Sequence, residues 1–227
     1  MKKILCTLLI LVLSLIIYGY NIEYHAEYSS FSMSQLKKFQ DDILYSFDEP
    51  NHIKIMHNYP NNITHKLFII QRSKKYSYGI FGGFTSTGSR LHQSDFTGDY
   101  KFDQIISMYE LGFFGEEINK TFFNNRLVPY LQISYIKNVF RINEMLVIED
   151  QKFKSSATFE SIGLSGQVGF SFLIINKFLD IKLNLGYRLS HSYGLHLKDN
   201  KNALLYSESG HAKPNWDGFR LGLIFSY

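Results

Sequence analysis

Cysteine is nearly absent from this 227-residue chain, and so are long apolar runs and blocks of positive charge. The one cysteine, Cys6, lies in a targeting segment, so the mature protein is expected to have no disulfide and no thiol chemistry. Mean hydropathy is -0.12, and only the first stretch approaches the length of a membrane helix, which excludes a polytopic helical protein. The net charge of +4 is scattered, and the longest basic run is Lys74-Lys75, so nothing indicates a nucleic-acid surface.

The first 19 residues predict a secretory signal. Lys2 and Lys3 precede an apolar Leu/Ile/Val stretch that ends at the small residue Gly19. Cys6 precedes most of the apolar stretch, so it is not placed as a lipoprotein cysteine. The alternative is an uncleaved anchor helix. We expect export, followed by one mature domain over residues 20–227.

Aromatic residues are plentiful, with 20 Phe and 16 Tyr, and in the last segment they alternate with small or polar residues. Such residues suit the aromatic girdles of a membrane barrel, although an AT-rich genome would also favour them. One side of residues 216–227 carries Phe219, Leu221, Leu223, Phe225 and Tyr227. The other side carries Gly218, Arg220, Gly222 and Ser226. This pattern predicts a closing strand that is apolar toward lipid, and it resembles the C-terminal insertion signal of bacterial outer-membrane proteins.

The same period-2 alternation recurs along the chain and predicts about eight strands. The expected strands cover residues 21–30, 65–72, 76–85, 100–113, 127–147, 157–172, 178–190 and 216–227. The non-apolar side of 157–172 is Ser, Gly and Gln, which fits neither a soluble core nor a solvated surface. The fold class is therefore predicted as all-β, a transmembrane antiparallel up-and-down β-barrel; a soluble sandwich or lipocalin-like barrel is the alternative.

Between the strands we expect one short amphipathic helix and several loops. Helical spacing of apolar residues predicts the helix over residues 33–44, with Ser32 as its N-cap. Loops are expected at residues 49–62, 86–99 and 191–214, with shorter connections at 119–125, 150–154 and 176–177.

Charged residues on the inner side of the strands predict a polar lumen. These residues are Glu110, Asp180, Lys182, Arg188 and Arg220. An eight-stranded barrel is just wide enough for its own side chains or one small ligand, so a wide pore is excluded. We interpret the charges as a buried ion-pair network, with a narrow selective channel as the alternative.

The expected loop 86–99 and the residue after it contain a distinctive set of residues: Ser86, Thr87, Gly88, Arg90, Asp95, Gly98 and Tyr100. With Phe96 and Thr97 as conservative departures, this motif resembles that of a family of Bacteroidetes outer-membrane β-barrel proteins. The resemblance also covers the signal, the short helix and the last strand. The resemblance implies a surface-exposed barrel of undefined activity. The same residues also suit plain turns, in which Arg90 pairs with Asp95 or Asp99.

His191 and Ser192 suggest an enzymatic alternative, because outer-membrane lipid A deacylases carry a His and a Ser near a strand end. The match is poor, since that family has His-x-Ser-Asn and adjacent strand residues point to opposite faces. The eight histidines lack the spacing of a metal site, so no metal and no cofactor is expected.

The sequence thus predicts a non-enzymatic protein of the cell outer membrane with a structural, binding or adhesion role. Expected partners are outer-membrane lipid, lipopolysaccharide and the barrel-insertion machinery, with no nucleic acid, and we expect a monomer. A lipid A deacylase-like enzyme and a small channel for apolar solutes are the alternatives.

Overall fold

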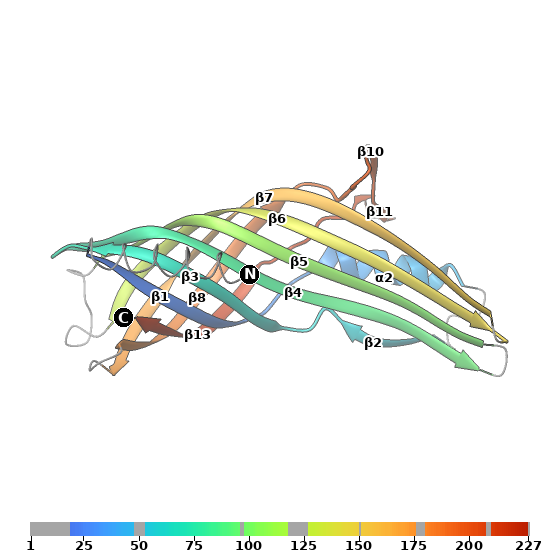
Figure 1. The fold of residues 1–227 in the computed structure, drawn as a ribbon, viewed down its shortest axis with the longest axis horizontal. Helices are drawn as coiled ribbons and strands as arrows, with labels where there is room; N and C mark the ends of the chain where they lie inside the picture. The colour runs from blue at the N-terminus through green and yellow to red at the C-terminus, as the bar shows by residue number, and fades with distance from the viewer. Residues whose placement is uncertain are drawn as a thin grey trace, which may run out of the picture.

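The computed structural model describes residues 19–47, 53–95, 98–117, 127–149, 151–175, 180–207 and 210–226. Within these ranges the chain is almost entirely antiparallel β-structure with one helix, α2 (Figure 1). The predicted all-β class with a single short helix is confirmed at this level. Most of the predicted signal (residues 1–18), the connections at 119–125, 150 and 176–177, Phe96, Thr97, Tyr227 and the Asp95 side chain lie outside the described residues.

Eight strands pair in a path that returns to its start. They are β1 (Tyr20–Ser29), β3 (Asn62–Arg72), β4 (Tyr76–Asp95), β5 (Gly98–Glu117), β6 (Leu127–Ile148), β7 (Gln151–Ile175), β8 (Asp180–Ser192) and β13 (Gly218–Ser226). Consecutive strands from β3 to β8 pair with each other, β13 pairs with β8 and β1, and β1 pairs with β3. Each of these strands therefore has two antiparallel neighbours, and we call the set the ring.

Four strands continue well beyond the ring. β4 pairs with β3 only up to Phe84, and β7 pairs with β8 only from Gly163 onward. The register places Phe84, Tyr109, Lys137 and Ile162 side by side at this level. Beyond it, β4 to β7 form a projecting sheet whose β4 edge is covered by β2 (Lys54–Asn58). We call this sheet (residues 85–95, 98–108, 138–148 and 151–161), together with α2 and β2, the lobe.

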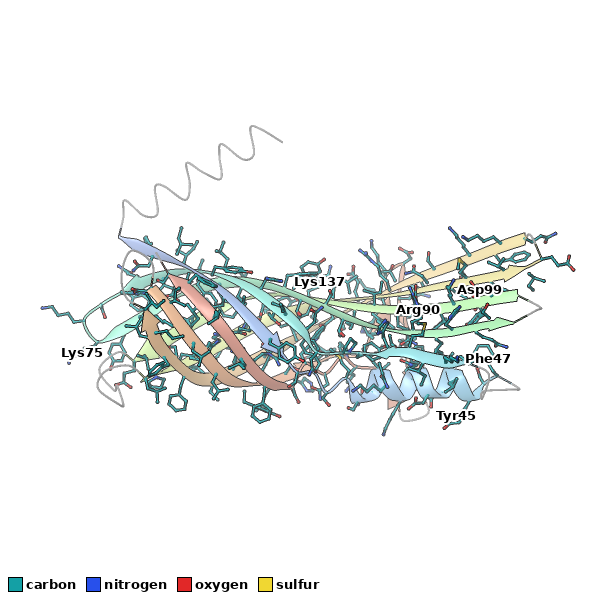
Figure 2. The ribbon with its side chains drawn as sticks, turned by 90° about the horizontal axis from the view of Figure 1, so that it is seen from below. Tyr45, Phe47, Lys75, Arg90, Asp99 and Lys137 are labelled. Atoms are coloured by element: carbon teal, nitrogen blue, oxygen red, sulfur yellow. The ribbon has the colours of Figure 1, made fainter. Side chains whose placement is uncertain are left out.

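Helix α2 (Ser34–Tyr45) lies along the lobe because one of its faces is apolar (Figure 2). Leu36 and Phe39 are buried and join a cluster that β5 and β6 complete from the opposite side. The cluster contains Phe31, Met33, Leu36, Phe39, Tyr59, Ile106, Met108, Ile136, Phe140, Leu195, Leu205, Ala212 and Trp216. The lobe thus has a hydrophobic core, which lies next to the end of the ring.

The prediction that Ser32 is the N-cap of α2 is wrong. Met33 occupies the N-cap position with φ 46, and no side chain caps the helix. The entry turn is held instead by backbone bonds, since Ser32 N–H donates to the Asp217 carbonyl at 3.2 Å and Met33 N–H to the Asn215 carbonyl at 3.1 Å. Packing against the segment before β13 therefore determines where α2 begins.

Three predicted loops contain strands. The described part of residues 49–62 holds β2, residues 86–95 form the far end of β4, and residues 98 and 99 begin β5. Residues 191–214 contain the end of β8, and four short strands follow: β9 (His196–Leu197), β10 (Asn200–Leu204), β11 (Tyr206–Ser207) and β12 (Gly210–His211). The predicted connection at 150–154 is also mostly strand, because β7 begins at Gln151. On β4 the outward residues Ser86, Gly88, Arg90, His92 and Ser94 are polar or small, which hid the alternation there.

Candidate functional site: the filled ring and its projecting lobe

The outer face of the ring is a continuous apolar band. Every ring strand contributes large apolar side chains that are exposed, with Phe113 at 72% and Leu111 at 65%. The band includes Tyr24, Tyr28, Ile63, Leu67, Tyr78, Ile80, Phe84, Tyr109, Leu111, Phe113, Leu131, Ile133, Tyr135, Ile162, Leu164, Val168, Phe170, Leu183, Leu185, Tyr187, Leu189, Phe219, Leu221 and Leu223. A soluble monomer does not expose an apolar surface of this extent. Beyond the level of Lys137 the outward positions turn mainly polar, as at Arg90 and Asp103.

The inside of the ring holds charged side chains of both signs. The basic residues are Lys66, Arg72, Lys182, Arg188 and Arg220, and the acidic residues are Glu23, Glu27, Glu110, Glu116 and Asp180. Five cations thus face five carboxylates. All five lumen residues predicted from the sequence are found here, but only some of them contact one another.

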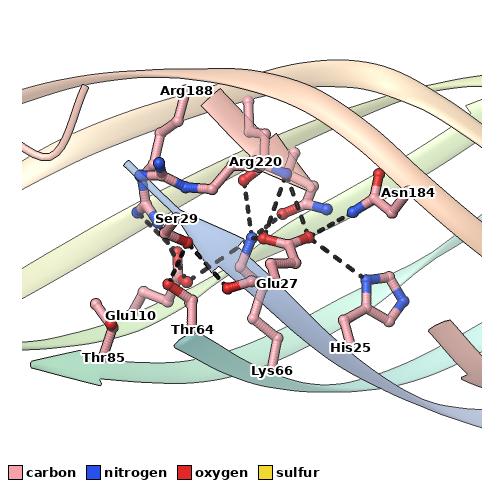
Figure 3. A network of polar contacts seen from close by, with 12 residues as sticks. His25, Glu27, Ser29, Thr64, Lys66, Thr85, Glu110, Asn184, Arg188 and Arg220 are labelled. Atoms are coloured by element: carbon pink, nitrogen blue, oxygen red, sulfur yellow. Dashed lines mark hydrogen bonds and ion pairs between the residues drawn. The ribbon is translucent and has the colours of Figure 1, made fainter. Parts of the chain in front are cut away.

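A chain of contacts runs through the lumen from Glu23 to Arg188, and Figure 3 shows its part from His25 to Arg188. Glu23 Oε2 lies 3.1 Å from His25 Nε2, and His25 Nδ1 lies 3.9 Å from Glu27 Oε1. Lys66 Nζ lies 2.9 Å from Glu27 and 4.0 Å from Glu110, and Glu110 Oε2 accepts a 2.8 Å bond from Arg188 Nη2. These contacts link side chains from the end of the ring that holds Tyr20 and Ser226, which we call the terminal end, to the end next to the lobe.

At the terminal end, Lys182 and Asp180 join this network separately. Lys182 Nζ is 3.3 Å from Glu23 and 3.6 Å from Glu116. Asp180 pairs with Arg72 at 3.6 Å, and Arg72 also bonds Glu23 at 2.7 Å. Pairing of this kind is what charges removed from water require.

Arg220 behaves differently from the other predicted lumen residues. Its guanidinium donates to the backbone carbonyls of Ser30 (2.7 Å), Phe219 (3.0 Å) and Trp216 (2.6 Å). It also lies 5.4 Å from the ring centre of Phe31. Arg220 therefore holds Ser30 and the segment 216–219 by hydrogen bonds to their backbone carbonyls. Among the described residues, no carboxylate is hydrogen-bonded to it.

The lumen is filled at the level of Lys66. The side chains of Lys66 and Glu27 have 0% exposure, so no water-sized space lies against them. Lys66 is on β3, and its Nζ also donates across the lumen to the side-chain oxygens of Gln132 (2.8 Å) on β6 and Gln167 (2.9 Å) on β7. The side chains of the wall thus meet across the lumen.

Glycines make this filling possible. A Cβ built on Gly83 would lie 2.7 Å from Glu110 Oε1, and one on Gly169 would lie 2.6 Å from the Tyr130 hydroxyl. Gly186 faces the same hydroxyl even more closely. Glu110 and Tyr130 therefore lie over the neighbouring strands, and they fit only because those strands carry glycine at the paired positions.

Sequence reasoning missed Lys66 and Arg72. In β3 the inward residues next to Lys66 are the buried Phe68 and Ile70, while the outward Leu67 and Ile69 are apolar too. Alternation is invisible when both faces are apolar. The one signal in the sequence was the position of Lys66 directly before the apolar run 67–70.

The described motif residues lie on strands β4 and β5 of the lobe, in the ranges 86–95 and 98–100, so the prediction of a surface loop is corrected. Thr87 and Ser89 point inward, and Gly88 and Arg90 help to line an open groove of about 420 Å³ on the outer face. Arg90 does not take the predicted partner: its guanidinium bonds the carboxylate of Asp103, which raises the pKa of Arg90. The register of β4 with β5, in which Arg90 faces Asp103, explains this pairing.

Asp99, at the far end of the lobe, has partners of its own. Its carboxylate accepts a 2.6 Å bond from Lys101 and lies 2.6 Å from His92, and these bonds lower the pKa of Asp99. Nearby, the hydroxyl of Tyr100 donates to Glu144 at 3.2 Å, and burial raises the pKa of Tyr100.

His191 and Ser192 do not form a nucleophile and base pair. His191 is exposed on the outer face beside Tyr193, with ring centres 5.9 Å apart. Ser192 is buried on the inner face, where it accepts a 3.2 Å bond from Asn138. Adjacent residues of a strand point to opposite sides, so the imidazole cannot activate this hydroxyl.

Two further observations concern the described residues. No group of three or more His, Cys, Asp or Glu side chains in them is placed to hold a metal ion. No helix in this part of the chain has both the length and the hydropathy needed to cross a membrane.

The chain matches no protein-family model and no curated protein sequence. Among solved structures it is similar to the attachment invasion locus protein Ail of Yersinia pestis, with 11% identity, a TM-score of 0.38, and coverage of 92% of this chain and 96% of that one. It is also similar to Neisserial surface protein A, with 12% identity, a TM-score of 0.33 and the same coverages. TM-scores below 0.5 establish neither a shared fold nor a shared function.

Proposed function

We propose that this chain is an outer-membrane β-barrel protein that holds a rigid lobe at the cell surface for a structural, binding or adhesion role. The observation that carries the proposal is the inverted distribution of side chains. The ring exposes Leu, Ile, Phe and Tyr on all its strands and buries ion pairs such as Arg188 with Glu110. Lipid is the solvent that favours this arrangement.

In this proposal the ring is a closed, transmembrane, up-and-down barrel of eight strands. Closure satisfies the backbone groups of every strand, which hydrocarbon demands. A barrel of this size has room only for its own side chains, in agreement with the filled level at Lys66. The same filling speaks against a small channel, and the separated His191 and Ser192 speak against a deacylase-like enzyme.

The proposal also assigns the ends of the molecule. The predicted signal at residues 1–19 would direct export, and the outward residues Phe219, Leu221, Leu223 and Phe225 of β13, with Tyr227, would serve the insertion machinery. The lobe would then stand outside the cell, with its polar outer face, including Ser86, Gly88 and Arg90, available for contact. Membership of the Bacteroidetes family is a proposal that rests on the sequence alone: on the predicted signal, the short helix, the motif of residues 86–100 and the last strand.

The test is the electrophoretic mobility of the detergent-extracted protein with and without boiling, together with cell fractionation and far-ultraviolet circular dichroism. We expect a β-rich species in the outer-membrane fraction that shifts on heating, and protease cleavage of the lobe on intact cells. A periplasmic species without a heat shift would refute the proposal. The apolar band would then have to be covered by another protein.

A further inference from the structure

A groove of about 470 Å³ lies where the apolar band of the ring ends, between β6, β7 and the segment that follows β8. Its apolar lining includes Tyr135, Ile162 and Tyr193. Three lysines line it as well: Lys137, which pairs with Ile162 in the β6–β7 register, Lys198 and Lys201.

The charges around this groove are unequal. Lys137 pairs with Glu160 at 3.0 Å, and Glu160 is the one carboxylate among the residues that line the groove. Asp199 is on the same turn as Lys198 but does not line the groove. Three lysines and one glutamate thus line the groove, so its lining carries two positive charges in excess.

The backbone holds the lysines of the connecting segment in place. Lys198 N–H donates to the Thr158 carbonyl at 2.9 Å, which docks the segment on β7. His196 Nδ1 lies 2.8 Å from the Lys201 carbonyl, and His196 itself pairs with Glu160 in the β7–β9 register. The groove is therefore formed by secondary structure rather than by a chance approach of side chains.

The position of the groove relates it to the membrane surface. Tyr135 belongs to the exposed apolar band, and Lys137 is the next outward residue on β6. Figure 2 shows Lys137 midway along the molecule, between Lys75 at one end and Asp99 at the other. Tyrosines followed by lysines mark the boundary between hydrocarbon and headgroups.

We infer that this groove binds a phosphate-bearing lipid of the membrane in which the ring sits. Its phosphate would lie against the three ammonium groups, and the start of an acyl chain would lie against Tyr135 and Ile162. Lysine binds phosphate as a point charge. Tyr135, Ile162 and Tyr193 present apolar surface in the same groove, which suits a ligand with a hydrocarbon part. The inference deepens the proposed function and rests on it.

The experiment is native mass spectrometry of the refolded mature protein in neutral detergent, titrated with diphosphorylated lipid A. The groove variant is Lys137→Gln with Lys198→Gln and Lys201→Gln. The matched control is Lys74→Gln with Lys75→Gln and Lys152→Gln, which loses the same three charges away from the groove. Further arms use dephosphorylated lipid A, and inorganic phosphate as a competitor.

We expect the groove variant to bind diphosphorylated lipid A at least tenfold more weakly than the wild type and the control. Removal of the phosphates should weaken wild-type binding by a similar factor, and a millimolar excess of inorganic phosphate should not release the lipid. Equal binding by the two variants would overturn the inference, as would complete release by inorganic phosphate, which would indicate a site for free anions. The heat shift separates the two failures, because its absence in the wild type refutes the proposed function, whereas its presence with equal binding refutes only the lipid site.

Discussion

Replacing Arg188 by Met should destabilise the protein strongly, because it removes the cation from a buried pair. Both side chains have 1% exposure, and Arg188 donates to Glu110 at 2.8 and 3.3 Å. Loss of one partner of a buried ion pair costs about 3–5 kcal/mol. Glu110 keeps a 3.1 Å bond from Ser134 and has Lys66 at 4.0 Å, so we expect the lower end, about 3 kcal/mol.

The matched control is Arg90→Met in the lobe. It is the same chemical change at an arginine that also pairs with a carboxylate, but the side chains of Arg90 and Asp103 are 41% and 27% exposed. An exposed pair contributes about 0–1 kcal/mol. The two variants should therefore differ by about 2 kcal/mol or more.

The assay is urea unfolding of the refolded protein in lipid vesicles, followed by the fluorescence of the single tryptophan, Trp216, which is buried. Adding Glu110→Met to Arg188→Met should restore most of the stability, since an apolar pair often replaces a buried ion pair at little cost. Losses for Arg188→Met and Arg90→Met that agree within about 0.5 kcal/mol would refute the reasoning, because they would show that water solvates the lumen charges.

Three further predictions follow from other parts of the structure. Gly186→Ala should lose about 1–3 kcal/mol in the same unfolding assay because its methyl group meets the Tyr130 hydroxyl, whereas Gly115→Ala, with open space around it, should lose much less; equal losses would contradict the close packing. The pKa of Asp99 is lowered, chiefly by the bond from Lys101, so the ionised carboxylate should stabilise the far end of the lobe above about pH 4. As the pH falls further this stabilisation should be lost, which hydrogen exchange of that segment would show. Asp99→Asn should abolish this pH dependence. The wild-type protein in planar bilayers should show no steady single-channel openings, and regular openings would show that the lumen conducts.

The strands of the ring could be predicted from the sequence because most of them alternate large apolar residues on the outer face with small or polar residues on the inner face. In β7, for example, Leu164 and Val168 are exposed, whereas Ser165 and Gln167 are buried. The two faces of the strand therefore differ in residue type, and the sequence alone shows this difference.

The lobe could not be predicted in the same way, because both faces of its strands contain polar residues. Along residues 86–95 the outward side is polar, and the inward side contains Thr87 and Ser89 as well as the buried Leu91, so the segment has the composition of a loop. The partners of the charges were equally hidden, because they depend on register: the β4–β5 pairing, rather than proximity in sequence, brings Arg90 to Asp103.

The most direct test of the central claim is a scan of nitroxide spin labels along β6, from Leu131 to Lys137, in the protein reconstituted in lipid vesicles. The chain has a single cysteine, Cys6, within the predicted signal, so each introduced cysteine would be the one labelling site in the mature protein. Labels at the outward positions 131, 133 and 135 should collide with oxygen dissolved in the lipid and avoid a water-soluble nickel reagent, whereas labels at 132, 134 and 136 should be shielded from both. High accessibility of the outward positions to the nickel reagent would show that the apolar band faces water, and it would contradict the account.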